Sequence, residues 1–80
     1  MRVMPNPVSD LLYVQFMERK SDELSVTLAD LSGRKIFQNR IPPESDQTNF
    51  DVSGIAEGVY FLIVANANRV METRKNVVIH

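Results

Sequence analysis

Strict alternation of apolar and polar side chains is the feature that most limits what this chain can fold into. In LSVTLAD, residues 24–30, Leu24, Val26 and Leu28 alternate with smaller or polar side chains, and LLYVQF, residues 11–16, repeats the pattern. Successive side chains of a β-strand point to opposite faces of its sheet, so this period predicts strands with one buried face. A helix would need a period near 3.6 residues. The chain is therefore predicted to be all-β.

Further strands are predicted along the rest of the chain. KIFQNRI (35–41) and TNFDV (48–52) are strands of mixed pattern, and VYFLIVA (59–65) is almost wholly apolar. A last strand is predicted within RVMETRKNVVIH (69–80), and a short one at RVM (2–4). Strands at this spacing without a long helix predict one domain over residues 1–80, a small antiparallel β-sandwich of about 6–7 strands.

The connections carry ordinary turn residues. Gly33 can close a tight hairpin after residue 30, and the prolines of PPESD (42–46) predict an exposed loop. The charged segment MERKSDE (17–23) is predicted to be a second hairpin loop. Residues 54–57 are predicted to form one helical turn that ends at Gly58, since glycine tolerates a left-handed stop.

The strand predicted at 59–65 leaves two alternatives open. Val59, Phe61 and Ile63 would point to one side, whereas the other side is equally apolar. Such a strand is usually central and covered on both faces. Two layers of cover are hard to supply in 80 residues, however, because so small a domain has a thin core. Either the strand is an ordinary core strand, or one face awaits a partner.

Composition excludes several classes of protein. There are no cysteines, so no disulfide and no cysteine-based metal site can stabilise the fold. The net charge is −1 and the basic residues form no dominant block, which argues against nucleic acid and against an electrostatic membrane anchor. No segment approaches the ~20 apolar residues of a transmembrane helix. MRVMPNPVSD has no signal-peptide core, so we expect a cytosolic protein or a piece of a longer exported chain.

Catalytic and ligand-binding residues are not expected. The single histidine, His80, is the last residue, where a catalytic arrangement is hard to hold. Asp10, Asp30 and Asp51 lie at strand ends, where aspartate commonly accepts hydrogen bonds from local backbone amides rather than binding calcium. Only three glycines are present, so there is no glycine-rich phosphate loop. We predict neither an enzyme nor a cofactor or metal site.

Three stretches, taken in order, carry a resemblance to a known family. VMPNPVSDLLYV opens the chain, VTLADLSGRKIF forms the middle, and FDVSGIAEGVYFLIV is followed by TRKNVVI. Together they resemble the C-terminal sorting domains of cargo proteins of the type IX (Por) secretion system of Bacteroidetes. The chain departs from that pattern at Met4, where the family usually has an aromatic residue, and at Asn76, which interrupts the basic–apolar end.

The resemblance implies a fold, a function and partners. It implies an Ig-like β-sandwich attached to an N-terminal cargo domain in the parent chain. It implies that the domain directs the cargo from the periplasm across the outer membrane, to the cell surface or the medium, in contact with an outer-membrane shuttle and a sortase that cleaves it off. The rival hypothesis is a stand-alone adhesion or carbohydrate-binding sandwich. A dimer through an edge strand is a further expectation.

Four short elements are predicted to be read by the translocon or sortase. Each also has a structural alternative: a rigid proline turn, a hairpin with a solvated basic exit, a glycine turn with a tyrosine corner, and a final strand with one apolar face. The final strand is also expected to leave unpaired backbone groups to which a partner strand could add. The elements are Pro5, Asn6 and Pro7; Gly33, Arg34 and Lys35; Gly58 and Tyr60; and Arg74, Lys75, Val77, Val78 and Ile79.

Overall fold

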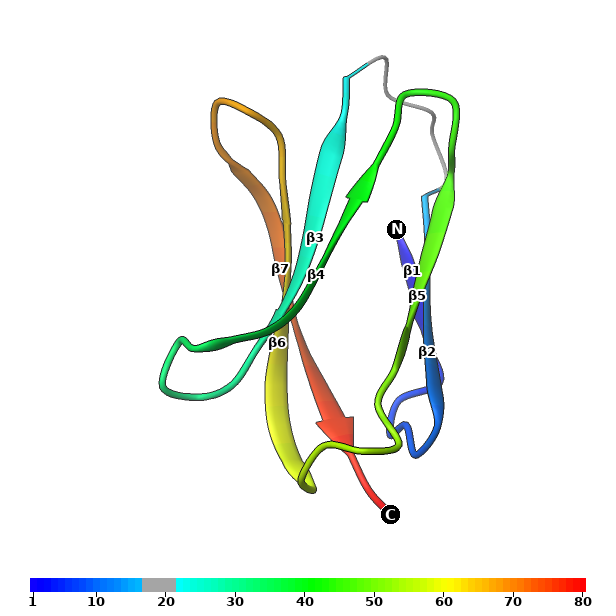
Figure 1. The fold of residues 1–80 in the computed structure, drawn as a ribbon, viewed down its shortest axis with the longest axis vertical. Helices are drawn as coiled ribbons and strands as arrows, with labels where there is room; N and C mark the ends of the chain where they lie inside the picture. Colours follow the sequence, from blue (N-terminus) through cyan, green and yellow to red (C-terminus); the bar gives the residue numbers. More distant parts are fainter. Residues whose placement is uncertain (17–21) are drawn as a thin grey trace.

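Two antiparallel β-sheets face each other in the computed structural model, which describes residues 1–16 and 22–80 (Figure 1). The described residues contain no helix, as the alternating pattern predicts. The prediction of an all-β sandwich is therefore confirmed. The seven strands are β1 (Arg2–Met4), β2 (Leu11–Gln15), β3 (Leu24–Ala29), β4 (Lys35–Ile41), β5 (Gln47–Asp51), β6 (Gly58–Ala65) and β7 (Val70–Val78).

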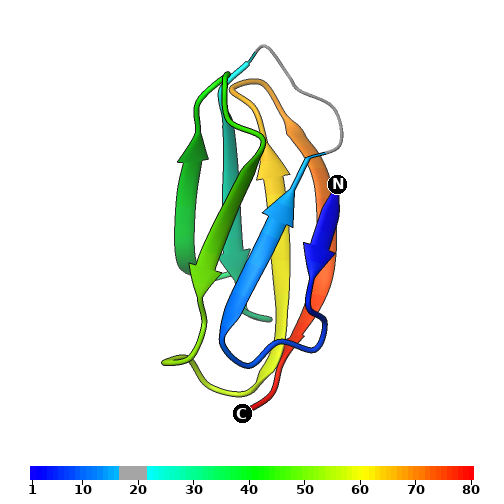
Figure 2. The same cartoon turned by 90° about the vertical axis from the view of Figure 1, so that its right-hand side faces the viewer.

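The strand order is that of an Ig-like Greek-key sandwich. One sheet has the order β1-β2-β5 and the other the order β4-β3-β6-β7, so the chain changes sheets after β2, after β4 and after β5 (Figure 2). The predicted hairpin between β2 and β3 is therefore wrong, because these strands lie in different sheets. Residues 17–21 of that connection lie outside the described residues.

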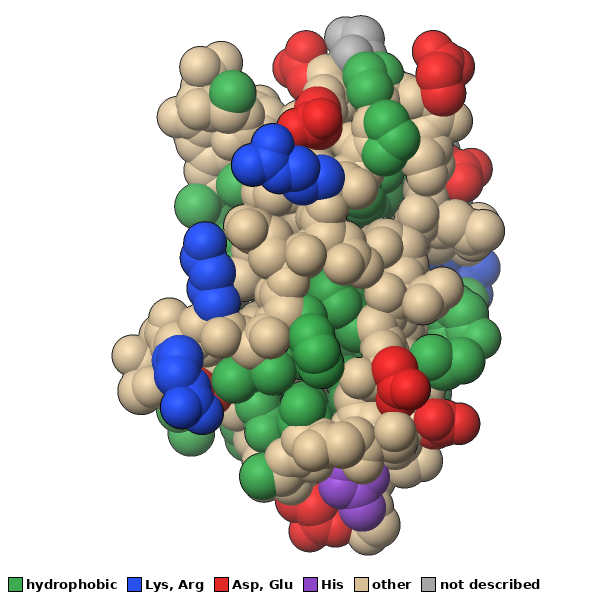
Figure 3. Space-filling view, in the orientation of Figure 1, with side chains coloured by type: hydrophobic (Ala, Val, Ile, Leu, Met, Phe, Trp, Pro, Cys, Tyr) green, Lys and Arg blue, Asp and Glu red, His purple; other side chains and the backbone are tan. Residues whose placement is uncertain are grey.

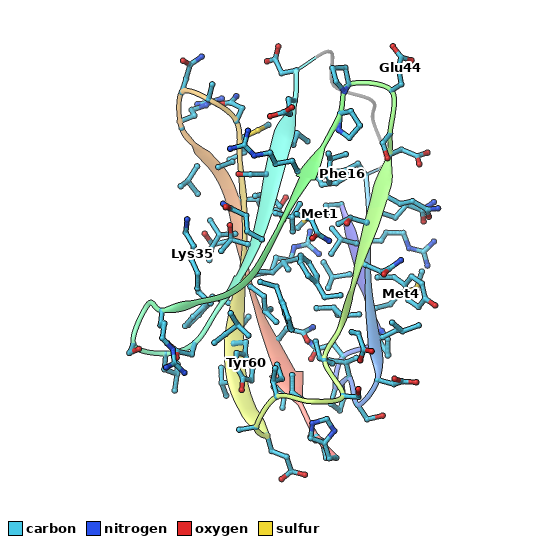
Figure 4. The ribbon with its side chains drawn as sticks, in the orientation of Figure 1. Met1, Met4, Phe16, Lys35, Glu44 and Tyr60 are labelled. Carbon is cyan, nitrogen blue, oxygen red and sulfur yellow. The ribbon has the colours of Figure 1, made fainter. Side chains whose placement is uncertain are left out.

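The core lies between the inner faces of the two sheets. The residues that alternation placed on the inner side are buried, with Leu12, Val14, Val26 and Leu28 fully enclosed. Met1 and Phe16 also lie between the sheets, whereas Met4 points outward (Figure 4). One residue in every two along these strands therefore contributes to a single apolar layer.

Strand β6 is one of the two central strands of the four-stranded sheet, and it lies between β3 and β7. Tyr60, Leu62 and Val64 point into the core, and Val59, Phe61 and Ile63 lie half-buried on the outer face. Within residues 1–16 and 22–80, no further strand or helix lies over that outer face. Of the two alternatives drawn from the sequence, the structure thus gives a core strand with only one face covered by a second layer.

The corner between β5 and β6 differs from its prediction. Residues 54–57 form a turn and a bend rather than a helical turn, and Gly58 begins β6 with a φ of 153°. Asp51 holds the corner, because its Oδ1 accepts hydrogen bonds from Ser53 N (3.0 Å) and Ser53 Oγ (2.6 Å). The Tyr60 hydroxyl donates to the Ala56 carbonyl at 2.6 Å, which confirms the predicted tyrosine corner.

Tyr60→Phe tests this corner. The substitution keeps the packed ring but removes the hydroxyl, leaving the Ala56 carbonyl without that donor. We expect the free energy of unfolding to fall by about 1 kcal/mol, which lowers the melting temperature by about 4–8 °C in a domain of this size. Thermal unfolding followed by circular dichroism measures the change. Tyr13→Phe, at a side chain that is 44% exposed, is the control and should leave the melting temperature unchanged. Equal melting of both variants would contradict the proposed role of the hydroxyl.

Candidate recognition site

The end of β7 pairs with the segment that follows β1. Val8 and Val78 form a parallel bridge, with Val8 N donating to Val77 O and Ile79 N donating to Val8 O, both at 2.9 Å. The Asn6 side chain adds a third bond, since its Oδ1 accepts from Val77 N at 3.1 Å. The expectation of an unpaired edge at the end of the chain is therefore wrong for residues 77–79.

The last residue is also held. His80 N donates to Glu57 Oε1 at 2.7 Å, and His80 Nε2 lies 2.7 Å from the Ile55 carbonyl, to which it donates. These partners precede β6, so the chain end is held from two sides. We call the whole arrangement the carboxyl clamp. It consists of Asn6, Val8, Ile55, Glu57 and residues 77–80.

Burial divides the terminal segment into structural and accessible parts. Val78 is 1% exposed and belongs to the core, Val77 is half-buried, and Ile79 is 49% exposed. A partner could therefore touch Ile79 on the folded domain, but not Val78. The other candidate with a buried side chain is Tyr60, which is 7% exposed. Contact with the buried side chain of either Tyr60 or Val78 would require the sandwich to open.

The proline turn lies beside the clamp. Pro5, Asn6 and Pro7 are all exposed, and both X–Pro bonds in this turn are cis. The side chain of Asn6 nevertheless faces Val77, as the hydrogen bond shows. The turn and the chain end, 71 residues apart in sequence, are thus one structural unit. Any partner that reads one of them approaches the other.

The hairpin between β3 and β4 is tightly ordered by one carboxylate. Asp30 Oδ1 accepts from Ser32 N (3.0 Å), Ser32 Oγ (2.6 Å) and Arg34 N (3.0 Å), and Arg34 Nε lies 3.3 Å from Asp30 Oδ2. The hydroxyl of Ser32, more than any other group, holds the pKa of Asp30 below its ordinary value of 3.8. Gly33 has a φ of 89°, which a side chain would strain, so its conformational role is clear. Arg34 and Lys35 are exposed.

The two basic residues of β7 do not form one patch. Arg74 pairs in register with Leu62, whose side chain faces the core, and its Nε bonds Glu72 Oε2 at 2.6 Å. Lys75 pairs with Phe61 and therefore lies on the outer face. Because directly opposed residues share a face, Arg74 and Lys75 point to opposite sides of the sheet.

The structure thus brings together part of the predicted set. The proline turn, Gly58 and residues 77–79 meet at one end of the sandwich. The tip of the 30–34 hairpin adjoins Gly58 on the other side of a shared hollow, whereas Arg74 and Lys75 lie further along β7. Sequence reasoning did not identify Val8, Ile55, Glu57 and His80 as partners of the chain end. The sequence gives a local signal for Val8 alone, as an apolar residue directly after Pro7, and this signal does not specify a distant partner.

Asn76 is a buried polar residue at the end of β7. It is 1% exposed, and neither its Oδ1 nor its Nδ2 has a hydrogen-bond partner among the described residues. A buried amide without partners costs free energy that an apolar side chain of similar size would not. The departure from the family pattern noted in the sequence is therefore also a weak point in the packing beside the carboxyl clamp.

Asn76→Val tests that conclusion. The variant removes the unpaired amide and places a β-branched side chain on a strand. We expect the free energy of unfolding to rise by about 1 kcal/mol or more, measured by urea denaturation. Asn49→Val, on an exposed position of β5, is the control for strand propensity alone and should raise stability less. A destabilised Asn76→Val protein would show that the amide is satisfied after all.

The lowered pKa values of Asp30 and Asp51 predict the response to acid. In both cases the largest cause is a serine hydroxyl, that of Ser32 or Ser53, bonded to the ionised carboxylate. A carboxyl group with a depressed folded pKa contributes stability above its unfolded pKa and loses it as the pH falls through the folded value. The free energy of unfolding should therefore decline below a pH of about 3.8. The double variant Asp30→Asn, Asp51→Asn should show a shallower decline in urea denaturation at a series of pH values. Parallel pH profiles would contradict the prediction.

Among residues 1–16 and 22–80, no three His, Cys, Asp or Glu side chains lie close enough to hold a metal ion. The same described residues include no helix of the length and hydrophobicity needed to cross a membrane.

Comparison with known proteins assigns the chain to a family. A family model described as a secretion system C-terminal sorting domain matches residues 2–80, which is nearly the whole chain. No curated protein and no solved structure gives a match. The matched range includes both halves of the carboxyl clamp, the 30–34 hairpin and the tyrosine corner. The chain belongs to the C-terminal sorting domain family of the type IX secretion system of Bacteroidetes.

Proposed function

We propose that this domain is the address by which a larger cargo protein is carried across the outer membrane through the type IX machinery. The observation that carries the proposal is the family match over residues 2–80, which is a match to a sorting signal and not to an enzyme family. The cargo would precede the domain in the parent chain. The cargo would reach the cell surface or be released after a sortase removes the domain.

Recognition on the folded domain would use its accessible residues. Of the predicted set, the proline turn, the hairpin residues Arg34 and Lys35, and Ile79 all have exposed side chains. Pro5 and Pro7 flank the residue that bonds β7, so a shuttle protein that contacts Ile79 would also meet this turn. The clamp would present Ile79 in a fixed position, which reduces the entropy lost on binding.

The rival hypothesis of a carbohydrate-binding sandwich has less support. Sugar sites usually offer exposed aromatic rings for stacking. Among the Phe and Tyr residues of the described ranges, Tyr13 alone is well exposed, while the others are half-buried or buried. A hollow of about 500 Å³ beside β3 and β4 has polar described lining residues such as Glu23, Gln38 and Arg40, and no aromatic ring among its described lining residues. The sorting function is therefore the better supported of the two.

The experiment places residues 1–80 behind a periplasmic reporter with its own signal peptide, in a type IX-competent cell. We expect the reporter in the medium or on the surface, and in the periplasm when the type IX translocon is deleted. Retention of the reporter in the competent strain would overturn the proposed function. Fractionation and immunoblotting measure the distribution.

Variants of the chain end separate recognition from folding. Deleting residues 77–80 removes Val78 from the core as well as the bonds of the clamp. A loss of export in that variant could therefore come from unfolding or from lost recognition. Ile79→Ser changes an exposed side chain and keeps the backbone bond to Val8. We expect Ile79→Ser to reduce export at an unchanged melting temperature, while Val70→Ser, at the 60% exposed first residue of β7, has no effect. Normal export of Ile79→Ser would show that this side chain is not read.

A further inference from the structure

The tip of the β3–β4 hairpin carries a large apolar side chain into solvent. Leu31 is 70% exposed, the highest value for a large hydrophobic residue among the described residues. The hairpin turns away from the three-stranded sheet, toward the outer side of the four-stranded one (Figure 1). Scattered exposed leucines are normal on protein surfaces, so the surroundings of Leu31 decide whether it has a role.

The hairpin holds Leu31 in a fixed position. Asp30 accepts three hydrogen bonds from Ser32 and Arg34, as described above, and the backbone adds two more: Gly33 N donates to Asp30 O, and Asp30 N donates to Arg34 O, both at 3.0 Å. The backbone of such a restrained turn loses little conformational freedom when a partner covers it. Leu31 is thus suited to act as a preorganised anchor.

A hollow connects Leu31 to the open face of β6. It has a volume of about 310 Å³, with Leu31 and Ser32 on the hairpin side and Gly58, Val59 and Tyr60 on the strand side. Val59 is on the outer face, in line with the half-buried Phe61 and Ile63. The hairpin and the start of β6 therefore form two walls of one shallow hollow of mixed polarity, in which Leu31 and Val59 supply the apolar side chains.

The charges around this surface are mainly basic. Lys35 lies on the outer side of the four-stranded sheet (Figure 4), and Lys75 is opposite Phe61 on the same face. Lys and Arg side chains gather along that side of the molecule, whereas Asp and Glu predominate over the other sheet and the ends (Figure 3). The charged residues that line the hollow itself are acidic: Asp30 is paired with Arg34, whereas Glu57 accepts from the uncharged backbone N of His80. The basic residues therefore lie around the hollow and not in it.

We propose that Leu31 and the outer face of β6 at Val59 and Phe61 form a docking surface for a protein of the export machinery. The partner would present an apolar ridge bordered by carboxylates: the ridge enters the hollow beside Leu31, and the carboxylates face Lys35 and Lys75. The proposal rests on the proposed sorting function and names a second contact, which adjoins the carboxyl clamp at Glu57. A lipid surface is the weaker alternative, because one leucine and a few cations give only marginal membrane binding.

The test uses the reporter fusion with residues 1–80. Burying a leucine contributes enough that Leu31→Ser should weaken binding about 10- to 100-fold, and we expect the exported fraction to fall about tenfold. Leu31→Met keeps the apolar volume and should export within about twofold of the parent. Leu11→Ser, the same substitution at a 37% exposed leucine of the three-stranded sheet, is the matched control and should also stay within about twofold.

Folding and charge are checked separately. The purified 1–80 variants should melt within a few degrees of the parent, because Leu31 contributes no core packing. Lys75→Glu, at an exposed residue, should lower export as well, since it would repel the carboxylates of the partner. This second variant keeps the test valid if Leu31→Ser proves unstable.

Each result decides between distinct outcomes. If the parent fusion stays in the periplasm, the proposed sorting function and the proposed docking surface are both overturned. If the parent is exported and Leu31→Ser and Lys75→Glu are exported equally well, only the docking surface is overturned. An equal loss for Leu11→Ser would also overturn it, since the effect would not be specific to this face. Cosedimentation of the purified domain with phosphatidylglycerol–phosphatidylcholine vesicles that depends on Leu31 would replace the protein partner with a membrane.

Discussion

The pairing of Val8 with the end of β7 is the interaction on which the rest of this small sandwich depends. A domain of 80 residues without cysteines has only packing and hydrogen bonds to hold its layers together. Segment 6–8 leaves the three-stranded sheet and bonds the last strand of the other, so one short stretch ties both layers to each other. Val8 and Val78, each 1% exposed, also close the core at that end.

This arrangement changes how the chain end should be understood. A terminal strand with open backbone groups would invite capture by strand addition, but here Val77 N, Val77 O and Ile79 N are already bonded to residues 6–8. A receptor that reads the folded domain would therefore meet side chains, chiefly Ile79 and the proline turn. The buried Asn76 beside the clamp indicates that this end is less well satisfied than the centre of the core.

Sequence periodicity predicted the faces of the strands well, and their partners less well. Alternation identified Leu12, Val14, Val26 and Leu28 as core residues because a period of two fixes which side a residue faces. It holds no information about which strand lies next to which, so the connection between β2 and β3 was wrongly expected to be a hairpin. Five residues around 53–57 were also too few for a pattern to distinguish a helical turn from an aspartate-capped one.

The predicted recognition set shows the same limit. The turn conformation of Gly33 and the hydrogen bond of the Tyr60 hydroxyl were predicted because both depend on nearby residues. Gly33 adopts a positive φ, and the hydroxyl of Tyr60 reaches a carbonyl four residues away. The clamp and the hollow beside Leu31 join residues separated by about 25 to 70 positions, and only the folded topology brings these together. The resemblance to a family supplied the function, which local physical signals alone did not contain.

The hydrogen bonds at Val77 and Ile79 have a consequence for association between copies of the domain. Exposed strand ends are the usual starting points for edge-to-edge polymerisation when many copies of a β-protein accumulate. Here segment 6–8 occupies that position within the same molecule, and the charged pair Arg74 and Glu72 lies on the inward side of the neighbouring stretch of β7. The end of β7 is thereby closed to edge-to-edge pairing with another copy of the domain.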